Sequence, residues 1–284
     1  MEQQKITGLD EWVDFLCKVE IPVLKHTARG LHNLLQDKDK LSARGIAHVI
    51  KHDPLMTIKL LRHLQQNKRR SQEHEVVEVE QALMILGLEA SLRNIPAKPL
   101  IEETHGKQEM EALICLLHVI HRSNQASSFA FDWAIHLNDL HFEEIRIAAL
   151  LHDIAELLMW CFSPTEMLKI RAMQQQDKTL RSNDAQTQVF GFSLDELKSE
   201  LVIKWSLPSL LITLMDDHHE KSSRVRNVSL AVKLARHAAN GWDDAALPDD
   251  YRNIAELLKM DIDEVISLIN AKSDKNHAVN MAVA

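Results

Sequence analysis

The stretch Ile145–Trp160, IRIAALLHDIAELLMW, decides the fold class of this chain. It is long enough for about four helical turns. Its apolar residues recur at helical spacing, which predicts a helix with one apolar face: Ile147, Leu150, Leu151, Ile154, Leu157 and Leu158. His152 and Asp153 lie in its middle, where a buried helix normally avoids charge. A neighbouring His and Asp in such a helix indicate either a metal site or a buried hydrogen-bonded pair.

Composition and charge narrow the class of protein. Among 284 residues there are seven Gly, seven Pro and one Tyr, which favours helices joined by short turns over a β-sheet protein. The chain is long enough to bury a sizeable core without disulfides. Its formal net charge of -8 argues against general binding to nucleic acid or to an anionic membrane surface. We therefore expect no nucleic-acid partner and no membrane partner.

The cysteines and the N-terminal residues indicate a cytoplasmic protein. Cys17, Cys115 and Cys161 are far apart and odd in number, and there is no CxxC pair, so a thiolate zinc site is not expected. Cys115 and Cys161 fall in apolar helical patterns, as small buried side chains do. The sequence shows no apolar signal region and no segment apolar enough to span a bilayer. We expect a cytoplasmic location with reduced thiols.

Helical periodicity continues through most of the chain. The longest predicted helix covers residues 110–137 and carries His118 and His121 at a spacing that permits joint ligation, although packing or surface roles are the favoured interpretation of both. Residues 174–188 are polar and predict a surface loop or a frayed helix, and residues 272–284 predict a disordered tail. Further helices are predicted over residues 195–205, 209–218 and 225–240.

A second His-Asp dipeptide, His52-Asp53, has a different context because Pro54 follows it. Asp before Pro is typical of a helix start, with Asp as the N-cap and Pro at the first helical position. The apolar pattern over residues 55–64 continues that helix. We therefore predict a capping role for Asp53 and no metal ligation by this pair.

Several motifs, taken in order, connect the chain to a known family. The main ones are IPVL at 21–24, DPLMTIKLLR at 53–62, VEQALMILGL at 79–88 and ALLHDI at 149–154. They are followed by Gly191-Phe192, Trp205-Ser206-Leu207-Pro208 and Asp217-His218-His219. This ordered set resembles the HDOD family, the HD-related output domains of bacterial signalling. Each motif alone is loose, but the ordered set is specific, and it extends roughly over residues 21–240.

The resemblance implies an all-α, multi-helix HDOD/HD-like fold, with a smaller N-terminal helical lobe packed on an HD-like helical lobe. It places the domain over residues 13–216, with the N-terminal lobe at 13–100 and the HD-like lobe at 110–216. Residues 217–284 would complete the HD-like lobe and end in the disordered tail. Domains of this family are usually regarded as regulatory rather than catalytic.

The resemblance also implies a candidate metal site. The parent HD superfamily hydrolyses phosphate esters at one or two metal ions, held by a first His, a His-Asp pair, further histidines and a late Asp. The metal lowers the pKa of bound water and so creates a nucleophile. Here His152 and Asp153 match the central pair, and His218 and His219 match a later double histidine. These four residues are candidate ligands of a vestigial site, with His121 as a further candidate.

Other positions depart from that ligand set. The first-His position aligns with Arg122, although the adjacent His121 could replace it after a one-residue slip. Leu194 stands where the family has a His, and Arg236 stands at the late Asp. A guanidinium cannot ligate a metal and repels it. We therefore favour the second interpretation of the central pair, in which Asp153 accepts hydrogen bonds from a histidine or from Arg236 inside the helical core.

The expected function is a non-catalytic bacterial signal-transduction or regulatory module that acts through protein–protein interaction with an unidentified partner. The alternative is a metal-dependent phosphohydrolase of the HD superfamily that acts on a nucleotide or phosphoester. A third interpretation is a sensor whose pocket binds a nucleotide or second messenger without turnover. No cofactor is expected, although the remaining ligands would permit weak binding of a divalent metal.

Overall fold

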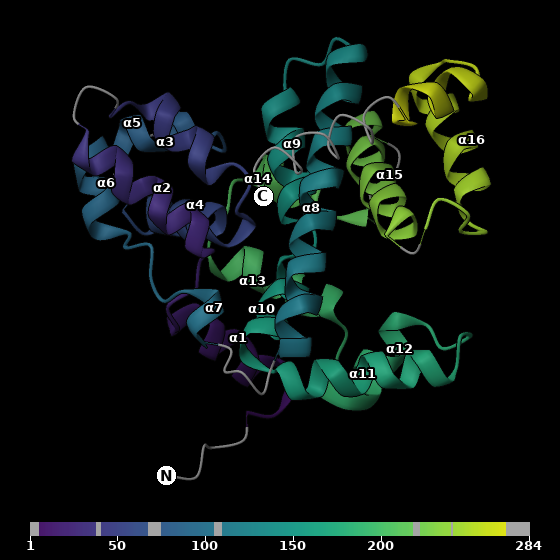
Figure 1. Cartoon of the computed structure of the whole chain (residues 1–284), viewed down its shortest axis with the longest axis horizontal. Coiled ribbons are helices and arrows are strands. Elements are labelled where there is room, and N and C mark those ends of the chain that lie inside the picture. The colour runs from purple at the N-terminus through teal and green to yellow at the C-terminus, as the bar shows by residue number, and fades with distance from the viewer. Residues whose placement is uncertain are drawn as a thin grey trace.

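The chain folds into packed α-helices, as the sequence predicts (Figure 1). The computed structural model describes residues 6–37, 41–67, 75–104, 110–217, 222–239 and 241–270. Within these ranges extended backbone pairs at a single isolated bridge, between Val23 and Leu100. None of the described helices combines the length and apolarity needed to cross a bilayer.

One group of helices lies around α4 (Pro54–Gln66), at the left of Figure 1. The group also contains α2 (Lys25–Gln36), α3 (Ala43–Ile50), α5 (Val79–Leu86) and α6 (Leu88–Asn94). Buried positions of α4 include two cations, Lys59 and Arg62. Lys59 Nζ donates to the carbonyl oxygens of Ile21 and Lys98 at 3.3 and 2.7 Å. The buried charge of Lys59 is therefore stabilised by backbone dipoles of the segments that flank the group.

The second group surrounds α8 (Met110–His136), which confirms the long helix predicted over residues 110–137. Helices α9 (Phe142–Leu151) and α15 (Ser223–Ala238) pack on α8, and α16 (Leu247–Leu258) packs on α15. The other members are α10 (Ile154–Phe162), α11 (Pro164–Gln176), α12 (Ser182–Phe190), α13 (Leu194–Lys204) and α14 (Ser209–Leu214). Residues 262–270 form a further helical segment.

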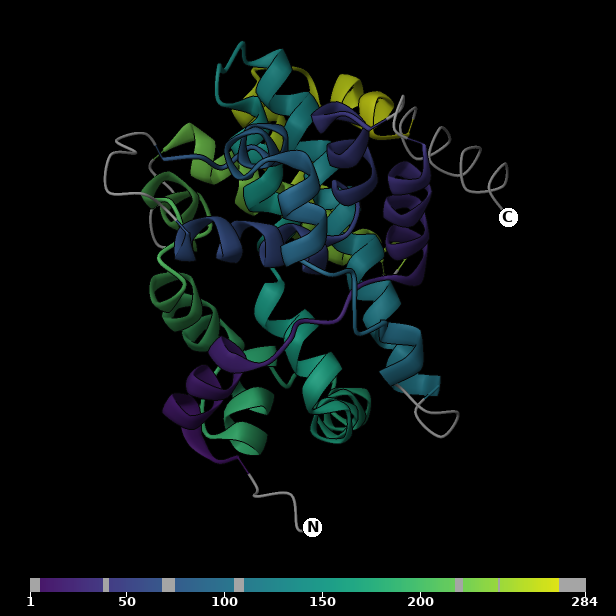
Figure 2. The same ribbon diagram turned by 90° about the vertical axis from the view of Figure 1, so that its left-hand side faces the viewer.

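Helix α1 (Gly8–Lys18) precedes the first group in the chain, and α7 (Ile101–Thr104) lies between the two groups in the sequence. Helix α1 packs against α13, far along the chain, as both views show (Figure 2). The guanidinium of Arg62 lies 6.0 Å from the centre of the Trp205 ring, which joins α4 to the end of α13. The lobe boundaries at 13–100 and 110–216 stay a prediction.

Three tryptophans belong to the core of the described residues. Trp133, Trp160 and Trp205 are all buried and belong to one continuous apolar cluster. The free thiol of Cys115 is buried as well, whereas Cys161 is partly exposed. Burial of large apolar side chains supplies the main driving force for packing these helices together.

Three helix predictions differ from the structure. The stretch 145–160 forms two helices, α9 and α10, separated by a turn at His152–Asp153. The polar stretch 174–188 is mostly helical, because α12 packs on α11 and α13 and buries Ala185 completely. Helix α14 ends at Leu214 rather than at residue 218, and its C-cap Met215 N–H bonds back to Leu211. The predicted tail 272–284 lies outside the described residues.

Candidate functional site

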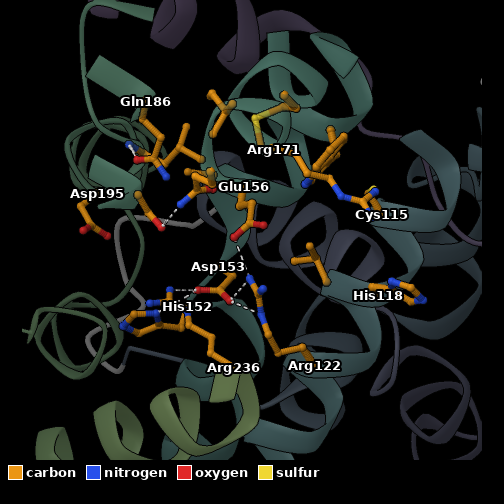
Figure 3. Close-up of a pocket in the computed structure, with 18 of the residues that line it drawn as sticks. Cys115, His118, Arg122, His152, Asp153, Glu156, Arg171, Gln186, Asp195 and Arg236 are labelled. Atoms are coloured by element: carbon orange, nitrogen blue, oxygen red, sulfur yellow. Dashed lines mark hydrogen bonds and ion pairs between the residues drawn. The ribbon is translucent and has the colours of Figure 1, made fainter. Parts of the chain in front are cut away.

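The turn between α9 and α10 exposes one edge of the His-Asp pair to a cavity of about 750 Å³ (Figure 3). Helices α8, α10, α11, α12, α13 and α15 all contribute to its walls. Because His152 and Asp153 stand in the turn rather than within one straight helix, Asp153 reaches side chains of α8 and α15. The break in the predicted helix therefore creates the site.

Two guanidinium groups take up both oxygens of the Asp153 carboxylate. Arg122 donates to Oδ2 from Nε at 3.1 Å and from Nη2 at 2.7 Å. Arg236 donates to Oδ1 from Nη2 at 2.5 Å. The Asp153 side chain is 4% exposed, so it is a buried anion that depends on charged hydrogen-bond donors. Figure 3 shows both arginines converging on Asp153.

Glu156 extends this cluster by one helical turn of α10. Arg122 Nη2 also lies 2.6 Å from Glu156 Oε2, so one guanidinium bridges two carboxylates. Burial would lower the pKa of Arg122, but the charges of Glu156 and Asp153 outweigh that effect and raise it. Arg122 therefore carries a permanent positive charge at this place.

His152 lies between two carboxylates. Its Nδ1 is 3.4 Å from Asp153 Oδ1, and its Nε2 is 3.2 Å from Asp217 Oδ1. Only a ring protonated at both nitrogens can donate to both oxygens. Burial opposes ionisation of Asp217, but the hydrogen bond from His152 and the positive charges of His152, Lys198 and Arg236 lower its pKa. The pair thus ties the end of α14 to the turn.

The charge state of Asp153 follows from the same neighbours. Desolvation by burial would raise the pKa of its carboxyl group. The positive charges of Arg236 and Arg122, together with the hydrogen bond from His152, hold that pKa well below its usual range. Asp153 is therefore ionised in the folded protein at neutral pH.

Most of the residues singled out from the sequence are described by the structure. Asp153 was predicted to accept hydrogen bonds from a histidine or from Arg236, and both side chains contact it. Arg122, which the alignment placed at a ligand position, is a second partner that the prediction did not name. A cation at a ligand position was the signal that could have revealed it. His121 is exposed on α8 and does not line the cavity, whereas His118 does.

The proposed double histidine lies outside the described residues. The prediction that His218 and His219 come close to Asp153 therefore stays a prediction. Asp217, which precedes them, is described and contacts His152. Sequence reasoning treated Asp217 only as part of a motif and gave it no partner.

The described residues do not fit a bound metal ion. Among them, no group of three or more His, Cys, Asp or Glu side chains is placed to hold one. Metal ligation by Asp153 needs a lone pair aimed at the ion, whereas guanidinium N–H groups contact both of its oxygens. Two fixed positive charges within hydrogen-bond distance also repel a cation. No hydrolytic step through a metal is derived from this arrangement.

Comparison with known proteins agrees with this fold. The family model described as HDOD domain matches residues 21–221, which is more than half of the chain. The protein belongs to the HDOD family, whose fold is related to that of the HD phosphohydrolases. A search of curated proteins found no match.

Solved structures share the fold at low sequence identity. A response regulator, MmoQ, from Methylococcus capsulatus is 19% identical with a TM-score of 0.60, covering 85% of this chain and 99% of that one. A virulence factor from Campylobacter jejuni is 17% identical with a TM-score of 0.63, covering 90% and 91%. At these identities the likeness concerns the fold.

Proposed function

We propose that this HDOD protein is a non-catalytic regulatory module that acts by binding another protein. One observation carries the proposal: Arg122 and Arg236 neutralise the Asp153 carboxylate that an HD hydrolase would use to hold metal. The arrangement satisfies a buried anion and leaves it no free oxygen for catalysis. The central ion cluster then acts as a structural link among α8, α10 and α15.

The chemistry of metal-assisted hydrolysis explains why the arginines matter. Such hydrolysis needs a cation that polarises the phosphoryl group and lowers the pKa of water. A guanidinium beside the carboxylate supplies a positive charge but no open coordination position and no activated water. A charge already balanced by arginine also removes the attraction that would recruit a metal. The phosphohydrolase alternative therefore lacks its first requirement among the described residues.

The comparisons are in line with a signalling role. One similar structure is named a response regulator, and that name supports a regulatory role for a chain of this fold. We propose a cytoplasmic location for this chain, since its charge argues against attachment to an anionic membrane surface. Capture of partners from the native organism should enrich the same partner with the unmodified chain and with Lys169→Met, a variant that alters a side chain that is 61% exposed.

Metal content and turnover test the non-catalytic part. The purified chain is stripped with chelator and reloaded separately with manganese, iron, magnesium or zinc. We expect no stoichiometric metal after dialysis and no hydrolysis of bis-p-nitrophenyl phosphate. Elemental analysis near one metal per chain, with hydrolysis abolished by Asp153→Ala, would establish the phosphohydrolase instead.

A double variant tests whether the two arginines exclude a metal ion. Arg122→His with Arg236→Asp restores the residue types of the metal-binding pattern at both departing positions. We expect this double variant to retain more zinc or manganese after dialysis than the unmodified chain, because two positive charges are removed and two donors are added. Equal metal retention by both proteins would show that the arginines do not determine metal exclusion.

A further inference from the structure

The first half of α8 exposes three large apolar side chains in line. Met110, Ile114 and Leu117 are 52%, 45% and 37% exposed, and we call these three residues the α8 stripe. Steps of four and then three residues place them on one side of the helix. Exposed apolar residues that occur singly are ordinary, whereas an aligned set indicates a surface for another molecule.

The opposite side of α8 packs against the rest of the protein. Ala112, Leu116 and Val119 are buried there, and the helical repeat places them roughly opposite the α8 stripe. Helices α9, α10, α11 and α15 pack on α8. In the part of the chain that the structure describes, the α8 stripe therefore faces away from the contacts that hold α8 in the fold. That side is open to a second molecule.

The spacing of the α8 stripe is that of a coiled-coil seam. Its members fall at successive d, a and d positions of a heptad repeat, and the exposed His121 continues the series at the next a position. Glu111 and His118 then occupy the two e positions that flank the seam, and both are exposed. The g position on the other flank is the partly buried Leu113. Charged groups therefore border the seam on one flank, and an apolar residue borders it on the other.

The flanking charges favour an antiparallel pair of identical helices. In such a pair the e positions of the two helices face each other, so Glu111 of each copy meets His118 of the other copy. A parallel pair would set each e position opposite a g position, where Leu113 offers no charge. Glu111 also lies 3.5 Å from Arg171, but the Glu111 side chain is 68% exposed. That ion pair contributes little and leaves Glu111 able to accept a hydrogen bond from His118 of the other copy.

We propose that the α8 stripe binds a second copy of this chain, with the two α8 helices antiparallel. The three apolar residues form the centre of the contact, and the two symmetric Glu111–His118 contacts form its rim. The seam covers about 12 residues, roughly 18 Å, so the dimer is weak and reversible. Because His118 also lines the cavity, the second copy lies at the cavity rim. This inference goes beyond the proposed function and does not depend on it.

Sedimentation equilibrium of the full purified chain, from about 5 µM to about 500 µM, tests the proposal. We expect a monomer–dimer equilibrium with a dissociation constant of about 10–300 µM, since the contact is smaller than a standard interface. Ile114→Glu should weaken dimerisation at least about tenfold, because it places a charge against the apolar seam of the other copy.

Ile203→Glu is the matched control, because Ile203 is an exposed isoleucine on α13 and receives the same substitution. It should dimerise as the unmodified chain does. If circular dichroism shows that Ile114→Glu has lost the fold, Met110→Gln decides, since Met110 is the most exposed member of the α8 stripe.

Exchange of the flanking charges tests the orientation. His118→Glu should weaken the dimer, because two carboxylates then face each other across the contact. Addition of Glu111→Lys to His118→Glu should restore dimerisation, since opposite charges face each other again. Positions 111 and 118 are seven residues apart on α8, too far to pair within one helix. Restoration would therefore come from the contact between the two copies.

Several results would overturn the inference. They are a monomer at every concentration, a dimer that Ile114→Glu retains, an equal loss in Ile203→Glu, and growth beyond the dimer, which a closed two-fold contact does not produce. Failure of the double variant to dimerise would refute the antiparallel pairing. A monomeric chain that loses a different protein partner through Ile114→Glu would assign the α8 stripe to that partner instead. None of these measurements concerns metal content or turnover, so the two proposals fail separately.

Discussion

Two His-Asp dipeptides, His52-Asp53 and His152-Asp153, are buried by the same fold in different ways. Asp53 is 0% exposed and Asp153 is 6% exposed, so burial alone does not distinguish them. Asp53 is the N-cap of α4, and its carboxylate accepts hydrogen bonds from the backbone N–H groups of Leu24, Leu55 and Met56 at 3.0, 3.0 and 2.9 Å. Asp153 precedes α10 as well, but its side chain makes no capping hydrogen bond.

The two carboxyl groups differ in their hydrogen-bond donors, which are backbone N–H groups at Asp53 and arginine side chains at Asp153. Burial raises the pKa of Asp53, because backbone N–H groups only partly replace lost solvation. Arg236 and Arg122 hold the pKa of Asp153 well below its usual range despite similar burial. In the first dipeptide, Asp53 therefore caps the start of a helix, whereas in the second, Asp153 keeps a negative charge beside the cavity. Of the two carboxyl groups, Asp153 lines the cavity and Asp53 does not.

The largest effect should come from Asp53→Ala. The substitution removes the acceptor of three backbone N–H groups at once. Loss of an N-cap and stranding of a buried donor together predict a decrease of about 2–4 kcal/mol in the free energy of unfolding. Urea denaturation monitored by circular dichroism measures it. Asp53→Asn, which keeps one carbonyl oxygen, should lose less; equal losses would mean that capping is not the cause.

Asp153→Ala should destabilise the protein by about 1–3 kcal/mol, the range for leaving buried polar partners unsatisfied. The loss is expected to be smaller than for Asp53→Ala, because Arg122 keeps Glu156 and the Arg236 side chain is 43% exposed. Denaturant midpoints of both variants in one buffer give the order. A larger loss for Asp153→Ala would reverse the comparison and make the ion cluster the main stabilising element.

The two aspartates should also respond oppositely to pH. Because the folded-state pKa of Asp153 is depressed, its ionisation contributes stability that is present above the unfolded pKa of about 3.9 and is lost as pH falls. Because the pKa of Asp53 is raised, stability is instead lost as pH rises above about 3.9. A tenfold difference in proton affinity between the folded and unfolded chains changes the free energy of unfolding by about 1.4 kcal/mol.

Unfolding experiments between pH 3 and pH 7 on Asp153→Asn and Asp53→Asn measure these differences. The stability advantage of the unmodified chain over Asp153→Asn should shrink on acidification. Its advantage over Asp53→Asn should grow. Parallel curves for the two variants would contradict the opposite charge environments.

His52→Ala should have the smallest effect, within about 1 kcal/mol. The His52 side chain is exposed, and its Nδ1 lies 3.2 Å from Asn124 Oδ1. Asn124 Nδ2 also donates to the backbone oxygen of residue 52 at 2.9 Å, and the substitution keeps that bond. Thermal unfolding compared with His152→Ala checks the point, since His152 is buried between two carboxylates and should cost more.

The features that were predicted correctly from the sequence are those that depend on residues close to one another along the chain. The N-cap role of Asp53 was predictable and is confirmed, because Pro54 and the first turn of α4 lie next to it in sequence. The family and the all-α fold were likewise predictable from ordered local motifs. The capping box at Ser193 and Glu196, also local, supports the start of α13.

What the sequence could not show depends on distant partners. The turn at Asp153 arises where its side chain meets Arg122 and Arg236, and periodicity within one segment contains no sign of either. Helix α12 was missed for a related reason, since its composition is polar and its buried residue is the small Ala185. The residues that line the cavity come from helices spread between α8 and α15. No short window of the sequence contains them all, so the cavity could not be predicted from local patterns.

The positions of the two arginines along the chain have a consequence for assembly. Arg122 is 31 residues from Asp153, whereas Arg236 is 83 residues away. Closing the longer loop costs about 0.9 kcal/mol more in chain entropy. Arg122 is also synthesised first, so a growing chain can pair Asp153 before Arg236 exists. The Asp153 carboxylate would then be paired with Arg122 from an early stage of synthesis. The later docking of α15 would add Arg236 as its second partner.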